Sequence, residues 1–135
     1  EYERQNKGYV VASMGELAGE LPYTSFIALD SYLSENEETC LKFIRALKKG
    51  YDFIKNNDDE TVANAIKNQF PSTDIISLKN SVKSYRAINA WVSDLKATES
   101  SFNRLQDIME FAGELPSRFA FSKLATNSLV QKALG

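Results

Sequence analysis

The sequence predicts an α+β fold that is predominantly α-helical, with a short N-terminal β-hairpin followed by about five helices. The hairpin is predicted by two short runs, residues 8–15 and 22–29, which are rich in β-branched and aromatic side chains and begin at glycine or proline. The helices are predicted because apolar side chains recur every three or four residues from residue 34 onward. With 135 residues, the chain has the length of one ordinary domain.

The second predicted strand, Pro22–Leu29, shows no clean alternation of side chains. Its proline is tolerated because the first residue of a strand needs no backbone donor. Polar and apolar side chains do not separate onto two faces, which favours a strand covered by protein on both sides. A two-stranded hairpin is only marginally stable in water, so either the helices or further polypeptide must cover it.

The first predicted helix begins at Ser34, which stands three residues before Glu37 in the spacing of a capping box. Cys40 falls within this helix and is predicted to be a core residue, because an unpaired cysteine packs like a small hydrophobe. The helix carries an apolar stripe on one face, formed by Leu41, Ile44, Leu47, Tyr51 and Ile54.

Four further helices are predicted from their end signals. The second helix ends before Pro71, because proline lacks the donor that a helix interior needs. Residues 72–74 cap the third helix and Thr98 caps the fourth, which Gly113 terminates. The rest of the chain is predicted to be irregular up to a weak last helix over residues 126–134.

The composition excludes several classes of function. The chain has no histidine and one cysteine, which excludes histidine-dependent nucleophilic triads, the common zinc sites and an internal disulfide. Acids and bases are mixed at a net charge of −2, so no nucleic-acid-binding face is predicted. The acidic runs at residues 36–38 and 57–60 stand at predicted helix starts, where unpaired amides explain them. We therefore expect no enzymatic activity, no metal and no cofactor.

The order of the segments resembles a known protein family. In sequence order these are "GYVVAS", "GELPYTSFIALDSYLSENEETCLKFIRALKKGYDFI", "NNDDETVANAIKNQFPSTD", "VKSYRAINAW" and "FNRLQDIMEFAGEL". Together they resemble the C-terminal part of the solute-binding proteins of ABC importers, in the group that takes up nitrate, sulfonates, taurine and thiamine-precursor pyrimidines. The resemblance covers essentially the whole chain, from about residue 7 to residue 134.

The resemblance implies a fragment of a two-lobed α/β fold of the periplasmic-binding-protein type 2 kind. Residues 1–29 would then be a β-hairpin and a crossover strand from the second lobe, and residues 30–135 the C-terminal helical part. In the full-length protein a small-molecule solute would be held between the lobes and delivered to the transmembrane subunits of an ABC permease.

The resemblance also implies an extracytoplasmic location, either in a periplasm or as a lipoprotein anchored to the outer face of the cell membrane. No apolar run approaches the roughly 20 residues that span a bilayer. The first residue is Glu1 and not methionine, so we expect the natural amino terminus to lie elsewhere.

The same resemblance supplies the candidate site residues. Tyr23 and Thr24 would lie where the family strand passes beside the cleft, as ligand or hinge contacts. Trp91 stands at a break between helices, where an aromatic side chain would line the cleft. Gly19 and Glu20 would belong to a turn beside the hinge. Ordinary packing is the alternative for all three: Tyr23 and Thr24 would pack in the strand with their hydroxyls bonded to neighbours, and Trp91 would bury its large area wherever it is placed.

A second function remains open, namely a stand-alone helical protein–protein interaction module that uses an exposed hairpin edge or an apolar groove. For a fragment of a larger receptor we expect a homodimer or strand exchange between copies, because apolar surface would be left uncovered. A catalytic use of the two-lobed architecture in pyrimidine biosynthesis is disfavoured, because the chain has no histidine.

Overall fold

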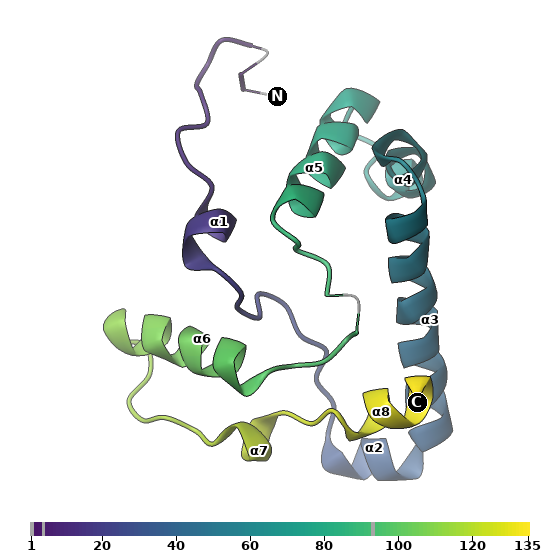
Figure 1. The fold of residues 1–135 in the computed structure, drawn as a ribbon, viewed down its shortest axis with the longest axis vertical. Coiled ribbons are helices and arrows are strands. Elements are labelled where there is room, and N and C mark those ends of the chain that lie inside the picture. The colour runs from purple at the N-terminus through teal and green to yellow at the C-terminus, as the bar shows by residue number, and fades with distance from the viewer. Residues whose placement is uncertain (1, 4, 93) are drawn as a thin grey trace. The chain divides into compact units, whose positions relative to one another are not determined.

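The computed structural model describes residues 2–3, 5–92 and 94–135, and every regular element in these ranges is helical (Figure 1). The elements are α1 (Met14–Ala18), α2 (Asp30–Glu35), α3 (Glu37–Asn56), α4 (Asp59–Ile66), the 3₁₀ turn η1 (Lys67–Gln69), α5 (Ile75–Ala87), α6 (Glu99–Phe111), α7 (Phe121–Leu124) and α8 (Ser128–Leu134). None of these helices is both long and apolar enough to cross a membrane.

The predicted β-hairpin and the α+β fold class are wrong, because the described residues contain no strand. Residues 8–13 have no regular structure, and Met14–Ala18 form α1, whose N-cap Ser13 accepts a hydrogen bond from the Glu16 amide at 3.3 Å. Residues 22–29 are likewise irregular. β-Propensity reflects packing against neighbouring strands, and neither segment finds such a neighbour here.

The chain divides into two compact units. Unit 1 comprises Glu1–Gly19 and Gly50–Ser93, and unit 2 comprises Glu20–Lys49 and Asp94–Gly135. Helix α3 therefore contributes its first part to unit 2 and its last part to unit 1. The predicted domain boundary between residues 29 and 30 stays a prediction.

Unit 1 has its core between α4 and α5. Val62 and Ala63 from α4 meet Leu78 and Val82 from α5, and each of the four side chains is at most 5% exposed. Ile54, Ile66, Ile75 and Trp91 pack around this cluster. The two helices pack together because each presents an apolar stripe at three- and four-residue spacing.

Arg86 fastens α5 to the turn that precedes α4. Its Nη2 donates to the Asn57 carbonyl at 3.0 Å, and its Nε lies 2.9 Å from Asp59 Oδ1. The Nε contact is an ion pair without the geometry of a hydrogen bond. Backbone and charge contacts thus fix the α4–α5 arrangement in addition to apolar packing.

Unit 2 is held by small aromatic and polar contacts. Leu41 of α3 is buried, and Phe26 meets Phe43 edge to face with ring centroids 4.8 Å apart. Phe102 of α6 contacts Phe121 of α7 in the same way, at 5.6 Å. One of the polar contacts joins α8 to α3: Lys132 Nζ donates a hydrogen bond to Glu37 Oε1 at 2.6 Å.

Several predicted helix ends are confirmed. The carboxylate of Asp74 accepts the Ser77 amide at 3.0 Å, and Thr98 Oγ1 accepts the Ser101 amide at 3.2 Å. Gly113 has φ +76° after α6, and the amide of the next residue reaches back five residues to the Met109 carbonyl at 2.8 Å. This is the Schellman arrangement that a terminal glycine favours.

Other helix boundaries differ from those predicted. Ser34 does not cap a helix, because its hydroxyl donates to the Ser31 carbonyl at 2.8 Å inside α2. The chain bends at Asn36, where α2 ends, and α3 begins at Glu37. Cys40, predicted to be buried, is partly exposed.

Candidate functional site

A concave surface in the described part of unit 1 lies along the polar face of α5 and has a volume of about 370 Å³. It is lined by Ser77, Asn80, Ser81, Ser84 and Tyr85. The depression is open, and its lining contains hydroxyl and amide groups but no charged side chain. Such a surface can form hydrogen bonds with a neutral polar ligand.

Two of the hydroxyl groups on this face already donate hydrogen bonds. Ser77 Oγ donates to Asp74 Oδ2 at 2.9 Å, and Ser81 Oγ donates to the Ser77 carbonyl at 3.0 Å. A serine hydroxyl that donates can also accept a hydrogen bond, and the side chains of Asn80 and Ser84, which have no hydrogen bond to the other described residues, can both donate and accept.

Trp91 borders the same helix. Its ring stacks on Tyr85 with centroids 5.7 Å apart and an interplanar angle of 24°, and it packs against the α4–α5 core. Tyr85 is 53% exposed, so the stacked pair presents an aromatic surface beside the hydroxyl row. Packing of Trp91 is therefore observed, and its ligand role stays a prediction.

The other predicted site residues belong to different parts of the chain. Tyr23 and Thr24 lie in unit 2 on an irregular segment, and the Tyr23 side chain is 94% exposed. Gly19 ends α1 with φ +68° in unit 1. Glu20 begins unit 2 and accepts a hydrogen bond from the Thr98 hydroxyl at 3.4 Å. Hinge or ligand roles for these four residues stay predictions.

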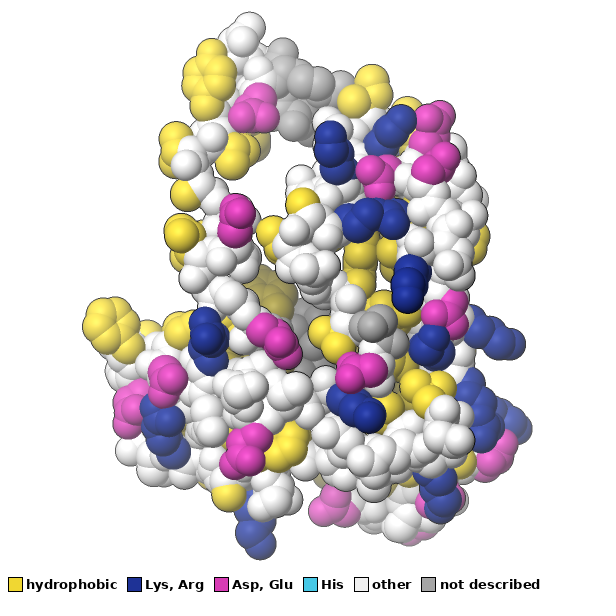
Figure 2. Space-filling view, viewed as in Figure 1, with side chains coloured by type: hydrophobic (Ala, Val, Ile, Leu, Met, Phe, Trp, Pro, Cys, Tyr) yellow, Lys and Arg dark blue, Asp and Glu magenta, His cyan; other side chains and the backbone are white. Residues whose placement is uncertain are grey.

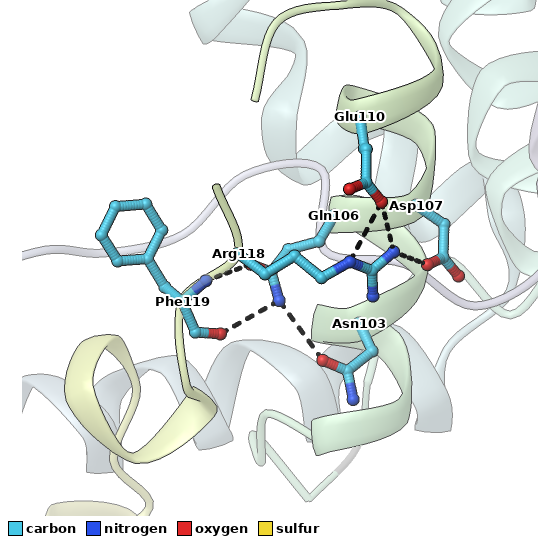
Figure 3. Close-up of polar contacts among 6 residues, drawn as sticks. All are labelled: Asn103, Gln106, Asp107, Glu110, Arg118 and Phe119. Atoms are coloured by element: carbon cyan, nitrogen blue, oxygen red, sulfur yellow. Dashed lines mark hydrogen bonds and ion pairs between the residues drawn. The ribbon is translucent and has the colours of Figure 1, made fainter. Parts of the chain in front are cut away.

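A buried glutamine that was not among the predicted site residues organises unit 2. Gln106 on α6 is 4% exposed and pairs with both backbone groups of Phe119. Its Oε1 accepts the Phe119 amide at 2.7 Å, and its Nε2 donates to the Phe119 carbonyl at 3.2 Å (Figure 3). The side-chain amide of Gln106 therefore makes the two hydrogen bonds to Phe119 that a neighbouring backbone segment would otherwise make.

Arg118 fixes the same loop to α6 from outside. Its guanidinium donates to Glu110 Oε2 at 2.9 Å and also to Asp107 Oδ1 (Figure 3). The hydrogen bonds to Asp107 and then to Glu110 raise the pKa of Arg118 above its usual value. Polar residues at positions 103, 106, 107 and 110 share one helix face. This spacing is the sequence signal that could have indicated that α6 binds the loop at residues 118–119.

A second side-chain amide, that of Asn127, pairs in the same way with the backbone just before α6. Asn127 Oδ1 accepts the Ala97 amide at 2.9 Å, and its Nδ2 donates to the Ala97 carbonyl at 2.8 Å. The side-chain amides of Gln106 and Asn127 both pair with loop backbone, so we assign them a role in positioning these loops.

Two further pKa shifts belong to residues at or paired with the start of α4. The Thr61 amide, followed by the Thr61 hydroxyl, lowers the pKa of Asp58. The hydrogen bond to Glu60 raises the pKa of Lys79. These shifts belong to a helix cap and a surface ion pair. No group of three or more histidine, cysteine or acidic residues in the described ranges could hold a metal ion.

The chain is similar to "Putative binding protein YtlA" from Bacillus subtilis (strain 168), with 34% identity over 131 residues. The match covers 97% of this chain and 39% of that relative, so the chain spans about two fifths of the relative's length. The name of the relative describes a binding protein and states no ligand. No protein-family model and no solved structure matches the chain.

Proposed function

We propose that this chain is part of a non-enzymatic binding protein that captures a small solute for an ABC importer. The solute would be a sulfonate, nitrate, taurine or a pyrimidine precursor, and the longer protein would deliver it to the permease subunits. The location would be extracytoplasmic, in a periplasm or on the outer face of the membrane through a lipid anchor.

The observation that carries this proposal is the match to a binding protein along 97% of the chain. A match of this extent includes both compact units, so it does not depend on one short motif. The ABC-importer context comes from the resemblance of the segment order described above.

The chemistry of the surface agrees with a binding role. The uncharged hydroxyl and amide row on α5, with the Tyr85–Trp91 pair beside it, supplies a few polar groups next to an aromatic surface. Small-molecule sites commonly combine these two features. A solute that binds one conformation better than another shifts the population toward it, which is how a permease would distinguish loaded from empty protein.

The test uses the reading frame that encodes this chain together with its flanking sequence. Thermal unfolding is measured with taurine, an alkanesulfonate, nitrate and an aminopyrimidine, because a ligand at 100 times its Kd stabilises the folded state by about 2.7 kcal/mol. We expect one solute to raise the Tm and deletion of the gene to abolish uptake of that solute. If none of the four raises the Tm, the proposed solute class is wrong.

Two substitutions test the candidate contacts in that protein. Tyr23→Phe and Thr24→Val each remove one hydroxyl, and we expect a weaker affinity for the active solute. Tyr32→Phe removes the hydroxyl of another partly exposed tyrosine and serves as the matched control. Equal affinity in all three variants would exclude these hydroxyls from ligand binding.

The second candidate function is a stand-alone helical protein–protein interaction module that acts through exposed apolar surface. The exposed apolar side chains of the N-terminal third favour it. A start codon directly before Glu1 and a stop codon directly after Gly135 would favour this alternative over the transport function.

A further inference from the structure

Apolar side chains are exposed very unevenly along the chain. Among the described residues, eleven large apolar side chains are more than 70% exposed, and ten of them lie between Tyr2 and Leu29. The exception is Phe111 at the end of α6. Figure 2 shows such side chains in yellow along the N-terminal segment. Scattered single exposures are normal in folded proteins, but a continuous series is not.

The series continues through both compact units. In unit 1 it consists of Tyr9, Val10, Val11, Met14 and Leu17, which are 71–96% exposed. In unit 2 it consists of Tyr23, Phe26, Ile27 and Leu29, which are 75–94% exposed. We call residues 9–29 the apolar segment.

The composition of the apolar segment is that of buried polypeptide. Glu16 and Glu20 are its only charged residues, whereas 25% of the whole chain is charged. Interfaces that are permanently buried are depleted in charge and resemble a domain core cut in half.

The hydrogen bonding of the backbone also indicates a segment that is covered in the longer protein. Within the described part of the chain, residues 20–28 neither donate nor accept a backbone hydrogen bond. Phe26 is anchored on Phe43 of α3, while Ile27 beside it is 93% exposed. One side of this stretch is therefore held by the chain, and the other side has apolar groups and backbone groups available to a partner.

We propose that the apolar segment is an internal packing surface, covered by polypeptide of the same longer protein outside these 135 residues. This inference rests on the proposed function only in requiring that longer protein. The occupant follows from length: the match uses nearly all of this chain but 39% of the relative, so most of such a protein lies outside the match.

The test measures thiol labelling without any solute, so its result is independent of solute binding. Cys40 is replaced by alanine, and Val11→Cys or Ile27→Cys is introduced into the protein encoded by the full reading frame. Each rate is compared with that of the same variant unfolded in urea. We expect labelling in the folded protein to be slower by about 100-fold or more, because a buried thiol reacts only when the structure opens.

Lys83→Cys in unit 1 and Lys42→Cys in unit 2 are the matched controls, since both lysines are exposed. They should label at nearly the rate of the unfolded protein. Labelling of Val11→Cys and Ile27→Cys as fast as the controls would overturn the proposal. Protection that appears only at concentrations where the protein dimerises would also overturn it, in favour of a second copy. A reading frame without flanking sequence would overturn it as well.

Discussion

Gln106 is a buried polar residue whose side chain contributes to the stability of unit 2. It is buried on α6 and satisfies both backbone groups of Phe119, so its removal leaves a donor and an acceptor without partners. A buried polar group that loses its partner costs about 1–3 kcal/mol. We expect Gln106→Leu to lower the free energy of unfolding by that amount, measured by urea denaturation.

The control for this prediction is Gln131→Leu, the same exchange on the exposed face of α8. Substitutions at exposed positions of this kind change stability by less than about 0.5 kcal/mol. Equal effects of the two variants would show that the Gln106–Phe119 pairing does not stabilise the protein.

Asp58 makes part of the stability depend on pH. The amide and hydroxyl of Thr61 lower its pKa in the folded state, so it stabilises the protein fully above its unfolded pKa of about 4. This contribution is lost as the pH falls through the lowered folded pKa. We expect the urea midpoints of the wild type and Asp58→Asn to differ more at pH 6 than at pH 2.5.

Glu35→Gln, at the end of α2, controls for the general effect of removing one carboxylate. Its difference from the wild type should change less between the two pH values. If the gap between the wild type and Asp58→Asn is the same at both pH values, the cap does not favour the charged carboxylate.

The helical elements show where a sequence is informative. The caps at Asp74 and Thr98 and the terminator Gly113 were predicted, because each is a local signal that needs only its own helix. The end of α5 is predicted only by a lapse of the apolar pattern from about residue 90, and its local signal was overlooked: Asn89 takes φ +49° and the amide of Ala90 reaches the Tyr85 carbonyl at 2.9 Å. Asparagine fills this left-handed position less often than glycine, so its signal is weaker.

The predicted strands failed for a different reason. Residues 8–15 and 22–29 have side chains typical of strands, but a strand exists only when another strand pairs with it. Pairing partners cannot be read from local composition. The α5 hydroxyl row was not predicted as a site for a related reason, since serines on an exposed helix face have no distinctive spacing of their own.

Two glycines in or after helices should respond to alanine with opposite signs. Gly50 lies inside α3, and a Cβ there would meet nothing within 4 Å, so Gly50→Ala should stabilise the protein by about 0.5–1 kcal/mol. Gly113 has φ +76°, and alanine there should destabilise by about 1 kcal/mol. Urea denaturation of both variants measures the difference.

Gly8→Ala is the neutral control, since Gly8 has open space for a Cβ and lies outside the helices. Stabilisation by Gly113→Ala would contradict the assigned helix end. Destabilisation by Gly50→Ala would contradict an exposed helical position.

At the scale of the whole molecule, the 135-residue chain by itself leaves its apolar segment in water. We expect it to self-associate as its concentration rises, because exposed apolar surface of this extent drives association. Static light scattering should give an average mass above 15.2 kDa. The double variant Val11→Ser, Ile27→Ser should remain closer to that mass, and a wild-type monomer at high concentration would contradict the prediction.

The α4–α5 core also has a consequence for synthesis on the ribosome. Its buried members lie between Val62 and Val82, so unit 1 can form this core while the C-terminal third is still being translated. Unit 2 joins partners as distant as Glu37 and Lys132, which are 95 residues apart. The first half of unit 2 can therefore complete its contacts only after α8 has been synthesised, and until then its apolar residues stay exposed to aggregation.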